Sequence, residues 1–106
     1  MLSTQPNARV HLTAAVLAAG VAAWLRCSAV EWALLVTGMT LVWVAEAVNT
    51  AIEFTVDLAC PERHPLAGKV KDVAAGAVLL AAVGSVVLGA IIFAPKLWAV
   101  ARKWME

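Results

Sequence analysis

A run of residues without a single charge, Val73 to Phe93, constrains this chain more than any other feature. As a helix it would be about 31 Å long, close to the roughly 30 Å hydrocarbon core of a bilayer. Two more apolar stretches precede it, Val10 to Leu25 and a longer one from Val30, and 63% of all residues are hydrophobic. We therefore predict an all-α integral membrane protein with three helices in each subunit.

The predicted transmembrane helices cover about 9–26, 29–59 and 67–94, within a single membrane domain of residues 1–106. Pro61 and Pro65 separate the second helix from the third, because proline lacks an N–H and disfavours helical conformation in the residue before it. Pro95 and Lys96 are expected to close the third helix and leave an aromatic, basic tail at the membrane interface. Three short spans enclose little by themselves, so we expect the subunit to self-associate.

The second helix carries polar residues that are unusual in a membrane helix. From Val30 to Leu58 it would measure about 43 Å and overrun the bilayer. If the core begins at Val30, Glu46 lies about 6 Å inside the far boundary and the later acids lie beyond it. At 100° per residue the polar side chains fall within an arc of about 80°. This stripe consists of Glu46, Asn49, Glu53 and Asp57.

The third helix enters the membrane on the same side, after Lys69, Lys71 and Asp72. Carboxylates a turn or two apart can hold Mg²⁺, and a nearby lysine can neutralise phosphate charge. A carboxylate just beneath the surface can take a proton from a lipid hydroxyl. The pattern favours phosphoryl transfer from a water-soluble donor to a lipid, without a Walker A or kinase glycine loop. The net charge of +1 gives no surface for nucleic acid.

Two segments resemble the small prokaryotic diacylglycerol kinases and undecaprenol kinases. "EAVNTAIEFTVDL" is similar to the family signature, which reads Glu-x-x-Asn-(Ser/Thr)-Ala-(Ile/Leu)-Glu-x-x-(Val/Ile)-Asp, and "HPLAGKVKDVAAGAVLL" is similar to the next family block. The likeness extends from about Asn7 to Leu97. "AVEWALL" and "IIFAPKL" resemble the undecaprenol kinase branch, which favours a polyprenol over diacylglycerol as the lipid.

The resemblance implies a homotrimer in the inner (plasma) membrane that transfers the γ-phosphate of ATP to a lipid hydroxyl at the cytoplasmic face and uses Mg²⁺. It implies a general base at Glu46, oriented by Asn49, and a metal ligand at Glu53. It gives Asp57 a supporting role in the same polar layer. The nucleotide contacts that it implies are Glu53, Glu62, His64, Lys71 and Asp72.

The N-terminus departs from the family pattern. Family members carry an amphipathic surface helix and then a Thr-Glu-Arg-Asn-like segment whose Glu is a second metal ligand. In "MLSTQPNARVHL", Asn7 and His11 match, Gln5 stands where the acid is expected, and we expect no surface helix among these residues. Gln5 offers a neutral oxygen, which is a weaker ligand for Mg²⁺ than a carboxylate. For His11 we expect a packing or interfacial role.

Two other functions compete with a lipid kinase. The substitution at Gln5 and the short N-terminus favour a catalytically impaired or non-enzymatic membrane assembly protein of the same fold. Carboxylates in membranes also serve ion and proton paths. A conducting oligomer is disfavoured because Val73 to Phe93 carries no polar relay.

Overall fold

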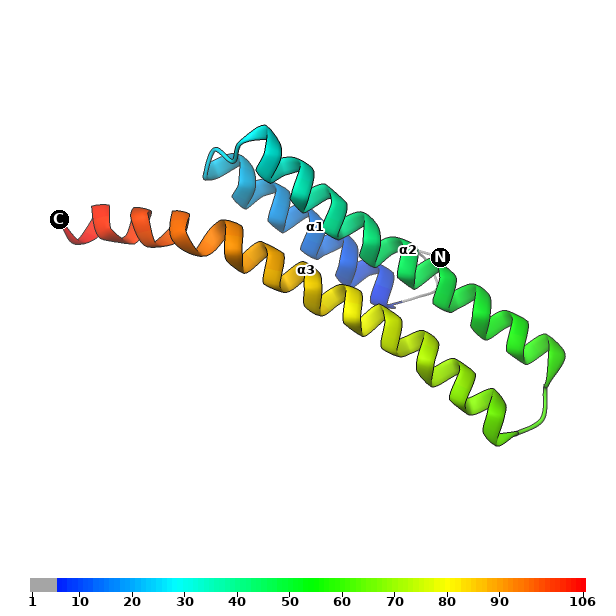
Figure 1. Cartoon of the computed structure of the whole chain (residues 1–106). Helices are drawn as coiled ribbons and strands as arrows, with labels where there is room; N and C mark the ends of the chain where they lie inside the picture. The colour runs from blue at the N-terminus through cyan, green and yellow to red at the C-terminus, as the bar shows by residue number, and fades with distance from the viewer. Residues whose placement is uncertain (1–5) are drawn as a thin grey trace.

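The computed structural model describes residues 6–106 and contains three helices in an up-down-up arrangement (Figure 1). The helices are α1 (Pro6–Trp24), α2 (Ala29–Ala59) and α3 (Pro65–Met105). The molecule is a rod of 63 × 24 × 23 Å. α2 and α3 pack along each other extensively, whereas α1 makes a much smaller contact with α2. The prediction of an all-α fold is confirmed.

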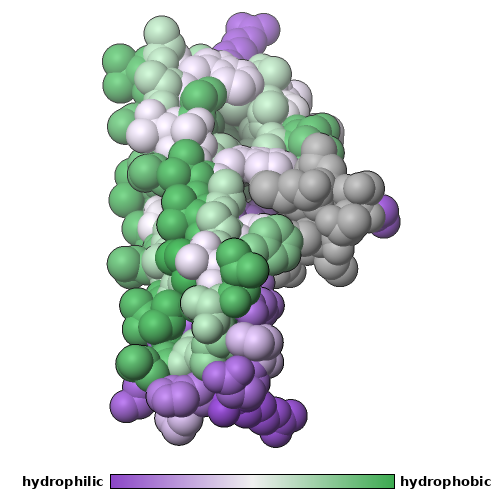
Figure 2. Space-filling model, turned by 90° about the vertical axis from the view of Figure 1, so that its right-hand side faces the viewer, coloured by the Kyte–Doolittle hydropathy of each residue, from purple (hydrophilic) through white to green (hydrophobic). Residues whose placement is uncertain are grey.

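Two of the three helices, α2 and α3, are long and apolar enough to cross a membrane, and α1 contributes a shorter apolar segment, Arg9–Trp24. Most large apolar side chains are exposed, and Figure 2 shows them along the length of the rod with hydrophilic side chains gathered at its ends. Such a surface is stable against lipid or another protein but not against water. The buried residues of the described chain are few: Ala22, Gly38, Val42, Glu46, Ala74 and Ile92.

The turn between α1 and α2 is stabilised by local hydrogen bonds on both sides. Arg26 has a φ of 54°, and its N–H and that of Cys27 bond back to the carbonyls of Ala23 and Ala22, which is a Schellman ending for α1. α2 then begins with a capping box, in which Ser28 Oγ accepts from the Glu31 N–H and Glu31 Oε1 accepts from the Ser28 N–H. This short turn makes α1 and α2 antiparallel neighbours.

The break between α2 and α3 falls where the prolines predict it, since α2 ends at Ala59 and α3 begins at Pro65. His64 caps α3, with Nδ1 accepting the Leu66 N–H at 3.1 Å. The far end of α3 differs from expectation, because Pro95 lies inside the helix, which continues to Met105. Continuing the helix through Pro95 loses one backbone hydrogen bond. Ending it there would leave carbonyl groups without partners, which is more costly in a membrane. The last part of α3 therefore extends past α1 and α2 (Figure 1).

Two ion pairs join α2 and α3 at opposite ends of their contact. Lys71 Nζ lies 2.5 Å from Asp57 Oδ1, and Lys96 Nζ lies 3.1 Å from Glu31 Oε1. Glu31 and Asp57 are about 39 Å apart along α2, which exceeds the roughly 30 Å hydrocarbon core. The pairs are therefore far enough apart to lie on opposite sides of a membrane core, and Glu46 is an acidic residue of α2 between them.

α2 and α3 lie close together at Gly38. A Cβ atom at this position would lie 3.1 Å from Leu88 Cδ2 and 3.1 Å from Ser85 Oγ. Glycine thus allows the two helices to come together, as small residues do at many membrane helix interfaces.

We expect Gly38→Val to lower the free energy of unfolding by about 1–3 kcal/mol, since the added methyl groups overpack this contact. The measurement is resistance to denaturation by SDS in mixed micelles, followed by circular dichroism. Gly20→Val is the matched control, because no heavy atom lies within 4 Å of a Cβ built at Gly20. Equal losses in the two variants would contradict a close approach at Gly38.

Candidate active site

Glu46 is the buried acid of the described chain, with 3% of its surface exposed. It projects from the middle of α2, and its Oε2 lies 3.1 Å from Nε2 of His11 on α1. The His11 side chain is 22% exposed, so the pair lies at the edge of the packed region and not deep within it. A carboxylate is thereby kept in apolar surroundings next to a polar partner from another helix.

Asn49, one turn after Glu46, supplies a second polar group in this region. Its Oδ1 is buried and has no hydrogen-bond partner within residues 6–106. A buried acceptor without a partner carries a free-energy cost of about 1–3 kcal/mol. This cost disappears if a bound molecule supplies a donor, so Asn49 is well suited to contact a ligand.

Further along α2 the polar stripe reaches the ion pair with α3. Lys71 donates a hydrogen bond to Asp57, and this bond raises the pKa of the Lys71 ammonium group above its usual value. The negative charges of Asp57 and Glu53 act in the same direction. Lys71 lies outside the charge-free span of α3 and keeps its positive charge at neutral pH, as binding of phosphate requires.

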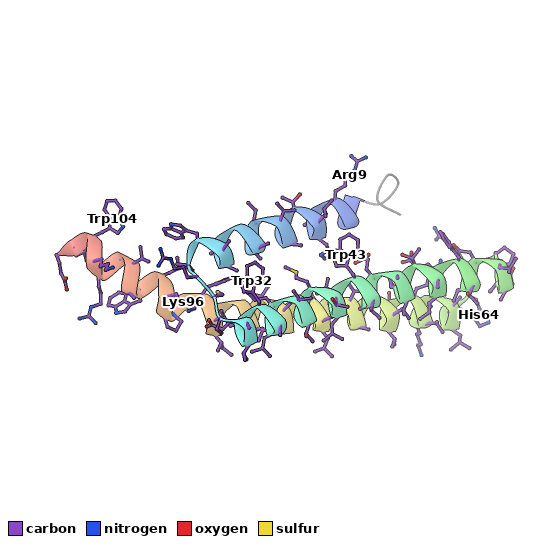
Figure 3. The ribbon with its side chains drawn as sticks, turned by 90° about the horizontal axis from the view of Figure 1, so that it is seen from above. Arg9, Trp32, Trp43, His64, Lys96 and Trp104 are labelled. Carbon is purple, nitrogen blue, oxygen red and sulfur yellow. The ribbon has the colours of Figure 1, made fainter. Side chains whose placement is uncertain are left out.

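The α2–α3 loop encloses an open hollow of about 480 Å³ at the end of the molecule where Figure 3 places His64. Glu62 and His64 line it from the loop, and Asp57 and Lys71 line it from the two helices. Nδ1 of His64 is occupied by the cap of α3, so this side chain also has a structural role. Asp72 follows Lys71 on α3 and is exposed.

The predicted residues therefore fall at two levels and not at one. Asp57, Glu62, His64 and Lys71 meet at the hollow, whereas Glu46 lies about 16 Å from Asp57 along α2. Glu53 lies between the two levels and is half-buried. The predicted polar residues of α2, from Glu46 to Asp57, connect the two levels along one edge of that helix.

A metal site is not formed by side chains of the described chain alone. Within residues 6–106 no three His, Cys, Asp or Glu side chains gather closely enough to hold a metal ion. Gln5, the other predicted ligand, lies outside the described residues. Glu53 nevertheless suits Mg²⁺, which is commonly bound by one or two carboxylates together with substrate phosphates and water.

Sequence reasoning assigned His11 a packing or interfacial role and missed its contact with Glu46. The signal that could have revealed this contact is the distance of each residue from the turn between α1 and α2. Antiparallel helices joined by a short turn place residues at similar distances from that turn side by side. His11 precedes the turn and Glu46 follows it by comparable lengths of helix, so the two polar groups share a level in an otherwise apolar layer.

Comparison with known proteins adds independent information. A family model described as prokaryotic diacylglycerol kinase matches residues 1–93. An undecaprenol kinase of Bacillus subtilis (strain 168) is 40% identical over 94 residues, which are 89% of this chain and 76% of the relative. A diacylglycerol kinase of Synechocystis sp. is 41% identical over 96 residues, or 90% of this chain and 55% of the relative. The diacylglycerol kinase of Escherichia coli (strain K12) is 38% identical over 79 residues, which are 74% of this chain and 65% of the relative.

We expect Asp57→Asn to lower the free energy of unfolding by no more than about 1 kcal/mol, because exposed ion pairs contribute little. The side chains of Asp57 and Lys71 are 62% and 38% exposed. The charge-exchanged double variant, Asp57→Lys with Lys71→Asp, should recover most of this small loss. Denaturation by SDS measures both effects, and a loss several times larger would show that the pair is shielded from water.

Proposed function

The chain belongs to the prokaryotic diacylglycerol kinase family, and we propose that it is a membrane lipid kinase that transfers the γ-phosphate of ATP to a lipid hydroxyl. The observation that carries this proposal is the buried carboxylate of Glu46 at the level where a lipid head group would meet the protein. A charged group inside a membrane helix is costly, and such residues mark functional sites.

Glu46 acts as the general base. Its carboxylate takes the proton of the lipid hydroxyl while the hydroxyl oxygen forms a bond to the γ-phosphorus of ATP. The bond between that phosphorus and the β–γ bridging oxygen breaks, and ADP leaves with the electron pair. The side chain of Asn49, whose Oδ1 has no partner within residues 6–106, lies one turn from Glu46 and orients the substrates next to the base.

ATP binds along the edge of α2 between Glu46 and the α2–α3 loop. The adenosine lies toward the hollow with Glu62 and His64, and the phosphates extend toward Glu46. Lys71, held by Asp57, supplies positive charge to the phosphates, and Asp72 adds a polar contact at the same level. Glu53, with Gln5 as a weaker partner, would hold Mg²⁺, which neutralises charge on the phosphate oxygens.

The protein is oriented with the α2–α3 loop in the cytoplasm, where ATP is available, and the membrane is the inner (plasma) membrane. Three copies form the working enzyme. The exposed apolar surface of one subunit supports self-association.

One observation favours a second candidate, a catalytically impaired assembly protein of the same fold. Gln5 stands where the family has a second metal-binding acid, and within residues 6–106 no three His, Cys, Asp or Glu side chains gather closely enough to hold a metal ion. Calorimetry with ATP separates the two functions, since an assembly protein in a well-folded oligomer would give no heat of binding.

We expect Glu46→Gln to reduce the rate of phosphate transfer by at least about 100-fold, the smallest factor usual for loss of a general base. The assay follows labelled phosphate from ATP into lipid in detergent micelles. Glu31→Gln is the matched control, because it removes a carboxylate from the opposite end of α2. Turnover that survives Glu46→Gln, with the oligomer intact by size-exclusion chromatography, would exclude Glu46 as the base.

The second expected result concerns the lipid. We expect a larger kcat/KM for undecaprenol than for diacylglycerol, because "AVEWALL" and "IIFAPKL" resemble the undecaprenol kinase branch. Both lipids are compared in the same micelles at matched mole fractions. A preference for diacylglycerol would assign the protein to the other branch and leave the catalytic proposal unchanged.

A further inference from the structure

The contact between His11 and Glu46 joins two helices that otherwise touch little. His11 belongs to α1 and Glu46 to α2, and their side chains meet at 3.1 Å between Nε2 and Oε2. The other interhelical ion pairs of the described chain lie at the two ends of the α2–α3 contact, with Glu31 bonded to Lys96 and Asp57 bonded to Lys71. His11 is therefore the partner from a neighbouring helix that reaches Glu46 in the membrane layer.

Glu46 needs such a partner because a buried charged or polar group without compensating hydrogen bonds costs several kcal/mol. On α1, Arg9 lies two residues before His11, while α3 contributes its charged residues at the levels of Asp57 and Glu31.

We propose that His11 is a positioning residue for the reaction: its Nε2–H donates to Oε2 of Glu46, fixes the orientation of the carboxyl group and leaves Oε1 for the lipid hydroxyl. This inference rests on the proposed function and deepens it. The proton of the hydroxyl goes to Oε1, the hydroxyl oxygen bonds to the γ-phosphorus, and ADP departs. His11 itself exchanges no proton with substrate.

The arrangement also gives α1 a role in the site. α1 contacts α2 over a small area, and Trp32 and Trp43 of α2 line a small apolar cavity between the two helices (Figure 3). The hydrogen bond between His11 and Glu46 fixes the position of α1 against this loosely packed surface. Lipid offers neither side chain a competing hydrogen-bond partner in this layer. The same bond fixes the orientation of the carboxylate.

The test compares His11→Leu with His11→Gln in the full chain. Leucine fills a similar volume and has no donor, whereas the side-chain amide of glutamine can donate to the same oxygen. We expect His11→Leu to lower kcat roughly 10- to 100-fold, the factor that corresponds to loss of a hydrogen bond to a charged group. KM for ATP should be unchanged, and His11→Gln should recover most of the lost rate.

Thr13→Ala is the matched control on α1, because the Thr13 hydroxyl is exposed and bonds to the Arg9 carbonyl within its own helix. This variant should keep the wild-type rate. A wild-type rate in His11→Leu would overturn the positioning role while leaving the proposed kinase activity intact. Equal losses of kcat in the leucine and glutamine variants would also overturn it, since a donor would then make no difference.

A second measurement reports the contact without relying on turnover. The chain has two histidines, so nitrogen NMR of protein labelled in histidine resolves the rings of His11 and His64. Glu46→Gln should move the ring nitrogen signals of His11 and leave those of His64 in place. Unmoved His11 signals would overturn the proposal. If the wild-type protein transfers no phosphate to either lipid, the proposed function fails and the positioning role fails with it, even where the NMR contact is observed.

Discussion

The cost of placing a carboxylate in hydrocarbon is the constraint on which this structure depends. Glu46 lies between the two ion pairs that join α2 and α3, and 3% of its surface is exposed. Lipid supplies no hydrogen bond, so the protein has to supply one. His11 does so from a helix that packs only lightly on α2, and the position of α1 relative to the site is thereby tied to the reactive group itself.

The positions of the remaining charged groups of α2 and α3 reflect the same free-energy cost of placing charge in hydrocarbon. Asp57 and Lys71 form a partly exposed pair near water, and Glu31 and Lys96 form another pair at the other end of the contact. Between these pairs the two helices meet through small and apolar residues, with a close contact at Gly38. The hairpin is thus held by packing in its apolar middle and by charges at its ends, and the proposed nucleotide site occupies the end that also has an open loop.

Much of this arrangement can be read from residue order because it depends on local rules. Val73 to Phe93 lacks charge and therefore has to be a membrane helix, and Pro61 and Pro65 end α2 and start α3 as their chemistry requires. The rule that proline ends a helix was wrong at Pro95. There the helix continues to Met105, because one missing N–H does not end a helix whose other backbone groups still need partners.

By itself, the sequence determined that the chain is helical, that it belongs in a membrane, and that Glu46, Asn49, Glu53 and Asp57 share one edge of α2, since helical periodicity and hydrophobicity are properties of consecutive residues. Only the tertiary structure decided which groups meet across helices. It paired Glu46 with His11 and Asp57 with Lys71, and it separated these pairs by about 16 Å along α2. The physical reason is that such contacts depend on the register and rotation of one helix against another, which are set by side-chain packing along the whole interface and not by any short stretch of residues.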